Sequence, residues 1–382
     1  MKSYSRFNLA ILTCTAFGLL AVGSVNAVID AFGILGNDNF FGLNRLKTEK
    51  FFHTKLFKAA DITRVQPRTV LLGSSRTDLG LDPAHQAVSE YGPVYNLGLV
   101  GPNMYEVFRY LEHAAANQPD LKRVVLGIDF FMFNEYKVNE VDFKEERLGR
   151  KSITPSDWLN ASLSFDALEG SLDTAQASLQ DDAYYLYRED GMRYVYGDRP
   201  DGSLVRKFED MIAGFIANQQ YYGDYELSED ALDALRGVVE LSQQRGIELE
   251  IFISPSHAAQ WEGLYEAGLW DDWEAWKQAV VEIAPVWDFS GYNTVTTEPI
   301  ADEMVNYWDS SHYRKEVGDW ILDRIFEQSN ASIPEDFGQK ITSETVNNWL
   351  TQVQEDRETW LSDDSNVEQR CKIIKDACQS PE

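Results

Sequence analysis

Short runs of apolar, largely β-branched residues recur along the chain and alternate with segments of helical spacing. Five of these runs indicate buried strands, at 69–72, 94–97, 124–128, 248–253 and 285–289. Helices are expected around them, at 103–116, 228–245, 258–283 and 315–328. Short, wholly apolar strands that alternate with helices are typical of a parallel sheet covered on both faces. The pattern predicts an α/β fold, a flavodoxin-like three-layer sandwich with a central parallel sheet of about five strands.

The N-terminus has a different pattern. Lys2 and Arg6 precede residues 7–28, which contain no charged residue. Roughly 20 apolar residues suffice for a helix to cross a bilayer, and short cationic flanks tend to stay in the cytoplasm. We therefore expect a single-pass transmembrane helix that leaves the remaining chain on the extracytoplasmic, periplasmic side of the cell membrane. Val25-Asn26-Ala27 also fits a signal-peptidase site, so release by cleavage is the alternative.

The same patterns suggest how the chain is divided. Residues 1–30 are expected to form the anchor, 31–65 a connector, and 66–330 the α/β domain. Weak periodicity at about 134–225 indicates an insertion within that domain, and the polar residues 331–382 are expected to be a peripheral C-terminal extension.

The net charge and the spacing of the histidines argue against several classes of partner and site. The net charge of −28 argues against a nucleic-acid partner and against a folded domain lying flat on anionic lipid. The five histidines are scattered, so no metal site is expected. Gly73-Ser74-Ser75 lacks the glycine spacing of a dinucleotide-binding turn, and no cofactor is expected.

Polar residues follow the strands, where ligands bind in open parallel sheets. They are Gly73-Ser74-Ser75-Arg76, the glycines Gly98 and Gly101 with Asn103, then Asp129, Ser254-Pro255-Ser256-His257 and Asp309-Ser310-Ser311-His312. Acyl transfer needs a serine nucleophile, a histidine base, a carboxylate that orients the histidine, and amides that hold an oxyanion. We therefore predict a triad of Ser75, His312 and Asp309.

These motifs resemble the SGNH (GDSL-like) hydrolase superfamily over roughly residues 66–330. The likeness rests on a Gly-x-Ser turn after the first strand, a glycine turn after the second and a late Asp-x-x-His. It is closer to the membrane-anchored bacterial branch, which includes the D-alanyl-transfer protein of teichoic acid and the O-acetylation proteins of alginate. The resemblance implies Ser75 as nucleophile, His312 as base, Asp309 as its partner, and an oxyanion hole made by the amides of Ser75 and of Gly98 or Gly101.

The chain departs from this family at Asp129, where the family has an asparagine that binds the oxyanion. An ionised Asp129 would repel an oxyanion, so Arg76 or Asn103 is the candidate replacement donor. His257 is a substrate-binding residue, a second base or a structural histidine. The tryptophans at 261, 270, 273 and 276 either stack on sugar rings or pack in the core.

The function expected from these residues is that of an extracytoplasmic serine esterase or O-acyltransferase. Its substrate would be an exported or cell-surface polysaccharide, and a membrane-embedded acyltransferase is a candidate partner. The alternative is a catalytically degenerate member of the fold that binds glycan or scaffolds an export complex, an interpretation that Asp129 favours.

Overall fold

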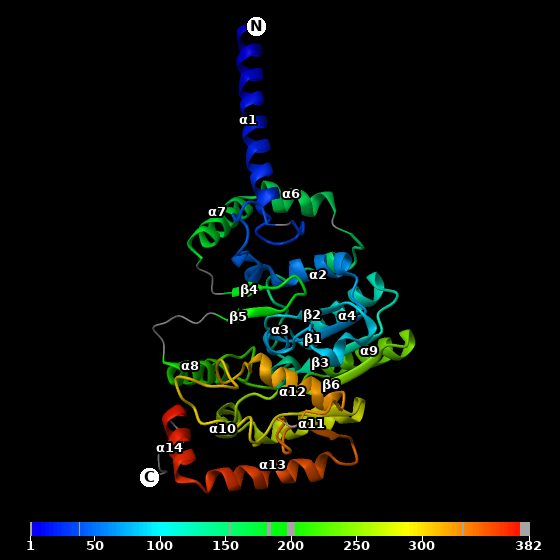
Figure 1. Ribbon diagram of the computed structural model, residues 1–382, viewed down its shortest axis with the longest axis vertical. Helices are drawn as coiled ribbons and strands as arrows, with labels where there is room; N and C mark the ends of the chain where they lie inside the picture. Colours follow the sequence, from blue (N-terminus) through cyan, green and yellow to red (C-terminus); the bar gives the residue numbers. More distant parts are fainter. Residues whose placement is uncertain are drawn as a thin grey trace.

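The computed structural model describes residues 2–37, 39–152, 154–181, 185–196, 203–330 and 332–374. Its centre is a six-stranded sheet in the order β2-β1-β3-β6-β7-β8, of which Figure 1 labels β2, β1, β3 and β6. The strands are β1 (Thr69–Gly73), β2 (Val94–Gly98), β3 (Arg123–Ile128), β6 (Glu248–Ile253), β7 (Val286–Asp288) and β8 (Gln339–Ile341). The first five in this order pair in parallel, and β8 pairs with β7 in the antiparallel direction. The predicted α/β fold with a mostly parallel sheet is confirmed.

The apolar strand runs are buried because both faces of the sheet are covered. Val70 and Leu72 of β1 belong to one core, whereas Leu71 between them belongs to the other. The first core contains side chains of α4 (Met104–Asn117), α9 (Glu229–Arg245) and α11 (Trp270–Ile283). The second contains side chains of α8 (Leu204–Ala217) and α12 (Lys315–Ile325). Since side chains alternate across a strand, a strand covered on both faces must be apolar throughout.

Residues 31–65, expected as a connector, contain more regular structure than the sequence indicated. They include η1 (Thr48–His53) and the helix α2 (Thr54–Val65), and Phe57, Ala59 and Ile62 of α2 are fully buried. The Ser228 side chain makes no capping hydrogen bond at the start of α9, although Gly246 ends that helix in the left-handed conformation, as its sequence suggests.

The C-terminal residues add to the sheet and to the core. β8 is a sixth strand that the sequence did not reveal, because Gln339 and Lys340 are polar and exposed at the sheet edge. It leads into α13 (Val346–Leu361) and α14 (Asp364–Ile373). Val346, Leu350 and Val353 of α13 are buried, and Arg357 Nε donates to Glu262 Oε1 at 2.7 Å.

The N-terminal helix α1 (Lys2–Ile29) projects from one end of the molecule, and α13 lies at the other (Figure 1). Residues Tyr4–Ile29 are long and apolar enough to span a membrane. The base of α1 contacts two helices of the predicted insertion, α6 (Pro155–Leu163) and α7 (Phe165–Gln180). The same insertion contains α5 (Glu145–Leu148), the hairpin of β4 (Tyr185–Tyr187) and β5 (Arg193–Tyr196), and α8.

Candidate active site

The turn after β1 exposes one hydroxyl group. Gly73 has a φ of 151°, and a Cβ there would lie 2.7 Å from the Gly127 carbonyl oxygen, so only glycine fits. The Ser74 side chain caps α3 (Ser75–Gly80) by accepting the Arg76 amide at 3.2 Å. Ser75 is half-buried, whereas Ser74 and Arg76 on either side of it are each 1% exposed. The turn therefore presents Ser75 to the surface and hides its neighbours.

A tight turn before α12 holds the histidine and its carboxylate. Asp309 Oδ1 accepts the backbone amides of Ser311 and His312, each at 2.8 Å. The Asp309 carboxylate also lies 2.9 Å from His312 Nδ1 through its Oδ2 atom. A ring nitrogen facing a buried carboxylate carries the proton, so Nδ1 donates and Nε2 is left as an acceptor. The turn thereby sets the tautomer that a general base requires.

The serine and the histidine meet across the sheet edge. Ser75 Oγ and His312 Nε2 are 2.8 Å apart, although the two residues are 237 positions apart in sequence. Asp309 is fully buried and His312 is 8% exposed, so the relay lies in a water-poor setting, and only the Ser75 end of it is partly open to solvent. The structure thus brings together Ser75, His312 and Asp309 in the geometry of a nucleophile, a base and an orienting acid.

Asp129 is held in a buried ion pair beside this triad. Arg76 Nη1 donates to Asp129 Oδ1 at 2.6 Å, and the Ser74 hydroxyl donates to Asp129 Oδ2. Burial opposes the charge on Arg76, but the neighbouring Asp129 carboxylate raises the Arg76 pKa above its ordinary value, so the guanidinium stays charged. Asp129 therefore meets a full positive charge, which offsets the repulsion of an oxyanion expected from the sequence.

Arg76 itself is a bracing residue and not a free donor. Besides Asp129, it donates through Nε to Ser311 Oγ at 3.0 Å. Its guanidinium also lies 5.6 Å from the centre of the Phe131 ring. Since Ser311 immediately precedes His312, Arg76 ties the helix that carries Ser75 to the turn that carries the base.

A second buried network fixes the other side of α3. The carboxylate of Asp78, one turn after Ser75, is bound by Lys58 of α2. It also accepts the Tyr187 hydroxyl at 3.0 Å and lies 3.1 Å from Arg193 Nε, and both of these residues come from the β4–β5 hairpin. The predicted insertion therefore contributes to the position of α3.

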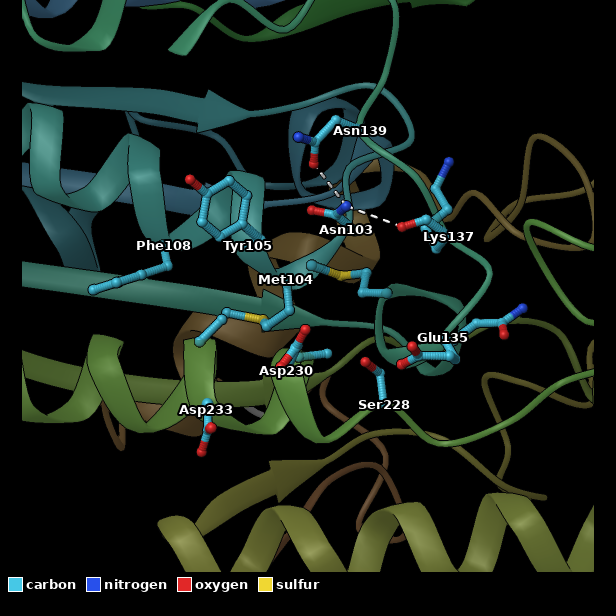
Figure 2. Close-up of a pocket in the computed structure, with 14 residues that line it drawn as sticks. Asn103, Met104, Tyr105, Phe108, Glu135, Lys137, Asn139, Ser228, Asp230 and Asp233 are labelled. Atoms are coloured by element: carbon cyan, nitrogen blue, oxygen red, sulfur yellow. Dashed lines mark hydrogen bonds between the residues drawn. The ribbon is translucent and has the colours of Figure 1, made fainter.

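Two of the expected oxyanion donors are engaged elsewhere. The Gly98 amide donates to Asn96 Oδ1 at 2.9 Å. The Asn103 side chain caps α4 and donates to the Lys137 carbonyl at 3.0 Å and to Asn139 Oδ1 at 2.9 Å (Figure 2). Gly101, at a φ of 57°, packs with its α-carbon toward Glu140 and Tyr221. From the expected set, this leaves the amides of Ser75 and Gly101 as candidate donors.

Asn103 instead lines a separate cavity of about 500 Å³ between α4 and α9. Figure 2 shows Met104, Asp230 and Asp233 around the same space. No triad residue lines this cavity. The interpretation of Asn103 as part of the Ser75 site is therefore corrected.

His257 is a structural residue. Its Nδ1 accepts the Ala259 amide at 3.1 Å as the cap of α10 (Ala258–Glu266), and its Nε2 donates to the Glu298 carbonyl at 2.7 Å. Burial lowers the His257 pKa to about 4, so the ring is neutral. Both nitrogens are occupied by backbone groups, and the alternative of substrate binding is not supported.

The four tryptophans after His257 pack in the core. Trp261, Trp273 and Trp276 are at most 1% exposed, and Trp270 is 8% exposed. The Trp261 and Trp273 ring centres are 5.3 Å apart. Their spacing therefore reflects helix packing and not a sugar-stacking surface.

The sequence reasoning missed the residues that support the triad. Ser74, Ser311 and Tyr222 all surround the buried Arg76–Asp129 pair. Each of the two serines is adjacent in sequence to a triad residue, but nothing in the sequence distinguishes a supporting serine from a surface one. Among the residues that the structure describes, no cluster of histidine, cysteine, aspartate or glutamate could hold a metal ion.

No protein-family model and no curated protein matches this chain.

Proposed function

We propose that this chain is an SGNH-like serine esterase or O-acyltransferase that forms an acyl-enzyme on Ser75. The observation that carries the proposal is the continuous relay from Ser75 Oγ to His312 Nε2 at 2.8 Å and from His312 Nδ1 to the Asp309 carboxylate at 2.9 Å. A surface serine and a chance Asp-x-x-His turn have no reason to meet in this orientation. The residues that brace it, Arg76 and Asp78, are buried and charge-paired.

The chemistry follows from the order of the groups. Ser75 Oγ attacks the carbonyl carbon of an ester while His312 Nε2 takes its proton. The ester C–O bond then breaks, and the departing alcohol receives that proton from His312. Water or a sugar hydroxyl next attacks the acyl-serine, losing its proton to His312, and Ser75 Oγ takes the proton back as the acyl group leaves. Asp309 keeps Nδ1 protonated throughout and stabilises the imidazolium.

The strand order supports the finer assignment of the fold. Numbered along the chain, the five parallel strands β1, β2, β3, β6 and β7 are arranged 2-1-3-4-5. That is the order of a flavodoxin-like sheet, in which ligands bind beyond the carboxyl ends of the strands. Ser75 follows β1 and Asp129 follows β3, so both lie at that edge.

The substrate class and the cellular side rest on the N-terminal helix. A cationic start followed by an apolar helix favours a domain outside the cytoplasm, where exported and cell-surface glycans are found. The proposed acyl acceptor or ester is therefore such a polysaccharide, and a membrane-embedded acyltransferase would supply acyl groups beside it. Alkaline phosphatase fused to the C-terminus of the full chain tests the side, and an inactive reporter would contradict the glycan substrate.

One observation favours a second candidate, a degenerate glycan-binding or scaffold protein. The family position of the oxyanion-binding asparagine is Asp129, whose carboxylate is committed to Arg76 and Ser74. The Gly98 amide is also engaged. A weak oxyanion hole would leave a triad that binds without turning over efficiently.

Reaction with a fluorophosphonate probe decides between the two candidates. An active serine is phosphonylated irreversibly, so wild-type protein should be labelled and Ser75→Ala should not. Ser256→Ala is the matched control, because Ser256 is a buried serine in the neighbouring loop. If the wild-type protein folds but takes up no probe, the proposed enzymatic function is wrong and the glycan-binding or scaffold function is favoured.

A further inference from the structure

The helix α7 in the predicted insertion has its side chains arranged in the reverse of the usual order. Its buried positions are all small residues, namely Ala167, Gly170, Ser171, Thr174 and Ser178. Its large apolar residues face outward: Phe165 is 90% exposed, Leu172 63% and Leu179 73%. A helix on the surface of a water-soluble domain places its large apolar residues toward the core. The outward face of α7 therefore needs an apolar surface outside the domain to cover it.

These exposed residues form one continuous stripe. Phe165, Leu172 and Leu179 are spaced by seven residues, which is close to two turns of helix and keeps them on one face. The half-buried Leu168 lies on the same side. The stripe runs the length of α7 and is far larger than the single exposed apolar residues that are normal on protein surfaces.

The neighbouring helix α6 extends the apolar surface. Trp158, Leu159 and Leu163 are each between 41% and 49% exposed. A tryptophan that is half-exposed next to leucines is typical of the boundary between lipid and water. Phe41, in the loop after α1, is 89% exposed as well.

The position of these helices identifies what covers them. A Cβ at Gly23 of α1 would lie 2.9 Å from Leu163 Cδ2, and Asn26 Nδ2 donates to the Ser162 carbonyl at 2.9 Å. The part of α1 that precedes Gly23 is exposed and apolar, and Phe17 and Leu20 there are 70% and 66% exposed. Figure 1 shows α6 and α7 on either side of the base of α1, lying across its axis. The bilayer that surrounds α1 would end at the level of these two helices.

We propose that α6 and α7 form an interfacial platform, a pair of helices that lies in the membrane surface around the base of α1. Trp158, Phe165, Leu172 and Leu179 enter the boundary between lipid headgroups and acyl chains. The occupant of this face is the lipid bilayer. The proposal rests on the membrane insertion of α1 but not on the acyl chemistry of Ser75.

The charges on α7 specify the kind of lipid contact. Asp166, Glu169 and Asp173 are exposed beside the apolar stripe. Carboxylates at the bilayer surface gain nothing from anionic headgroups, so the contact is apolar and does not depend on anionic lipid or on low salt. This agrees with the net charge of −28, which argues against attachment of the domain to anionic lipid but not against an apolar contact with the bilayer.

The consequence is a fixed orientation of the domain. A single helix alone allows the domain to swing about its connection, whereas two further helices in the interface restrict that motion. The β4–β5 hairpin follows α7 in the chain and contacts α3, the helix that carries Ser75. The platform would therefore hold the Ser75 edge at a set distance from the membrane.

Site-specific fluorescence in nanodiscs tests this placement with the full chain. A polarity-sensitive thiol dye is attached at Phe165→Cys or Leu172→Cys in a Cys14→Ala background, since Cys371 is disulfide-bonded. Thr351→Cys is the matched control, because it is exposed on α13 at the opposite end of the molecule (Figure 1). The discs contain phosphatidylcholine alone, with or without brominated acyl chains.

The dye at positions 165 and 172 should be quenched by brominated lipid and protected from iodide, and the dye at 351 should show the reverse. Equal iodide quenching at all three positions would overturn the proposal. Protection that persists in detergent and grows with protein concentration would also overturn it, in favour of a second copy covering α7. Replacing a third of the lipid with phosphatidylglycerol, or raising the salt concentration from physiological to molar levels, should leave the quenching unchanged.

A charge-introducing variant separates the platform from the anchor. Phe165→Glu/Leu172→Glu should abolish lipid quenching of a dye at Leu179→Cys while α1 still resists carbonate extraction. Val305→Glu, at a residue that is 72% exposed outside the insertion, should change neither. Fluorophosphonate labelling of Ser75 in detergent should be the same in the double variant, in Val305→Glu and in the parent protein. A failure of the platform would therefore change the lipid quenching alone, and a failure of the proposed enzyme would change the labelling alone. Lipid quenching at Leu179→Cys that survives the double substitution would contradict the platform.

Discussion

Two loops beside the sheet lie against each other, and each contains two serines followed by a histidine. One is Ser254-Pro255-Ser256-His257 and the other is Asp309-Ser310-Ser311-His312, and the His257 amide donates to the Ser310 carbonyl at 3.0 Å. Both ring nitrogens of His257 form hydrogen bonds with backbone groups. One ring nitrogen of His312 forms a hydrogen bond with a carboxylate and the other forms one with the Ser75 hydroxyl. Backbone partners lock a ring as a neutral cap, whereas side-chain partners leave it able to gain and lose a proton.

The carboxylates of the region repeat this contrast. Asp129 and Asp309 are both fully buried beside α3. Asp129 is paired with Arg76, which stays charged, so the pair can only brace the structure. Asp309 is paired with His312, whose charge can change during a reaction. The partner of each residue, and not its type or burial, therefore separates a supporting role from a chemical one.

The largest expected effect tests the two histidines. Replacing His312 with glutamine should lower the rate of fluorophosphonate labelling by about 10⁶-fold, as loss of a triad base does elsewhere. His257→Asn keeps an acceptor for the Ala259 amide and should retain the wild-type labelling rate. Thermal unfolding checks that both variants fold. If a folded His257→Asn protein loses labelling, the assignment of the two loops is wrong.

A subtler change tests Asp309. In Asp309→Asn the new side-chain oxygen would still accept the two backbone amides of the turn, but the amide nitrogen would face His312 Nδ1 and favour the other tautomer. This variant should therefore fold normally and lower the rate constant for hydrolysis of an activated ester by about 10⁴-fold. Asp233→Asn, in an exposed pair with Arg236 away from the triad, is the control. A rate within a few-fold of wild type in Asp309→Asn would contradict the tautomer argument.

Breaking the buried Arg76–Asp129 ion pair, the brace of the triad, should lower the stability of the fold. Arg76→Leu leaves Asp129 as an uncompensated buried charge, and the free energy of unfolding should fall by about 3–5 kcal/mol. The double variant Arg76→Leu/Asp129→Leu should recover much of it. Arg236→Leu breaks an exposed pair with Asp233 and should cost less than about 1 kcal/mol. Urea denaturation measures all three, and equal losses in Arg76→Leu and Arg236→Leu would refute the brace.

The smallest expected effect is a pH dependence at His257. Burial lowers its pKa to about 4, whereas the unfolded histidine has its ordinary value of 6.5. Between these values the unfolded chain binds a proton that the folded chain excludes. The His257 contribution to stability is therefore complete above pH 6.5, falls as pH drops to 4, and is constant below, with a total of about 3 kcal/mol.

The His257 contribution is measured as a difference between proteins. The free energy of unfolding of wild type minus that of His257→Asn should decrease from about pH 7 to about pH 4. Subtraction matters because burial raises the pKa of Glu106 to about 7, which makes stability change in the opposite direction over the same range. A flat difference would show that His257 is not held neutral.

Most of the sheet was predictable because its strands bury both faces. All five expected strands are present, and the apolar runs of β1 and β3 are buried along their whole length. The helix α2 was missed for the opposite reason. Its buried face includes Lys55 and Lys58, which reach Asp142 and Asp78, so it lacks the apolar stripe that marks a core helix. β8 was missed because its polar residues join the sheet only through backbone pairing at the edge.

The candidate site divides in the same way. The sequence by itself determined the α/β alternation and the apolar N-terminal helix, and it was enough to select Ser75, Asp309 and His312 as candidates, because these inferences depend on local burial patterns and on residue type. The tertiary structure decided that His257, Gly98 and Asn103 have other partners and that Asp129 is paired with Arg76. Which nitrogen, amide or carboxylate receives a given partner depends on side-chain pairings between residues far apart in the chain, and no local pattern encodes them.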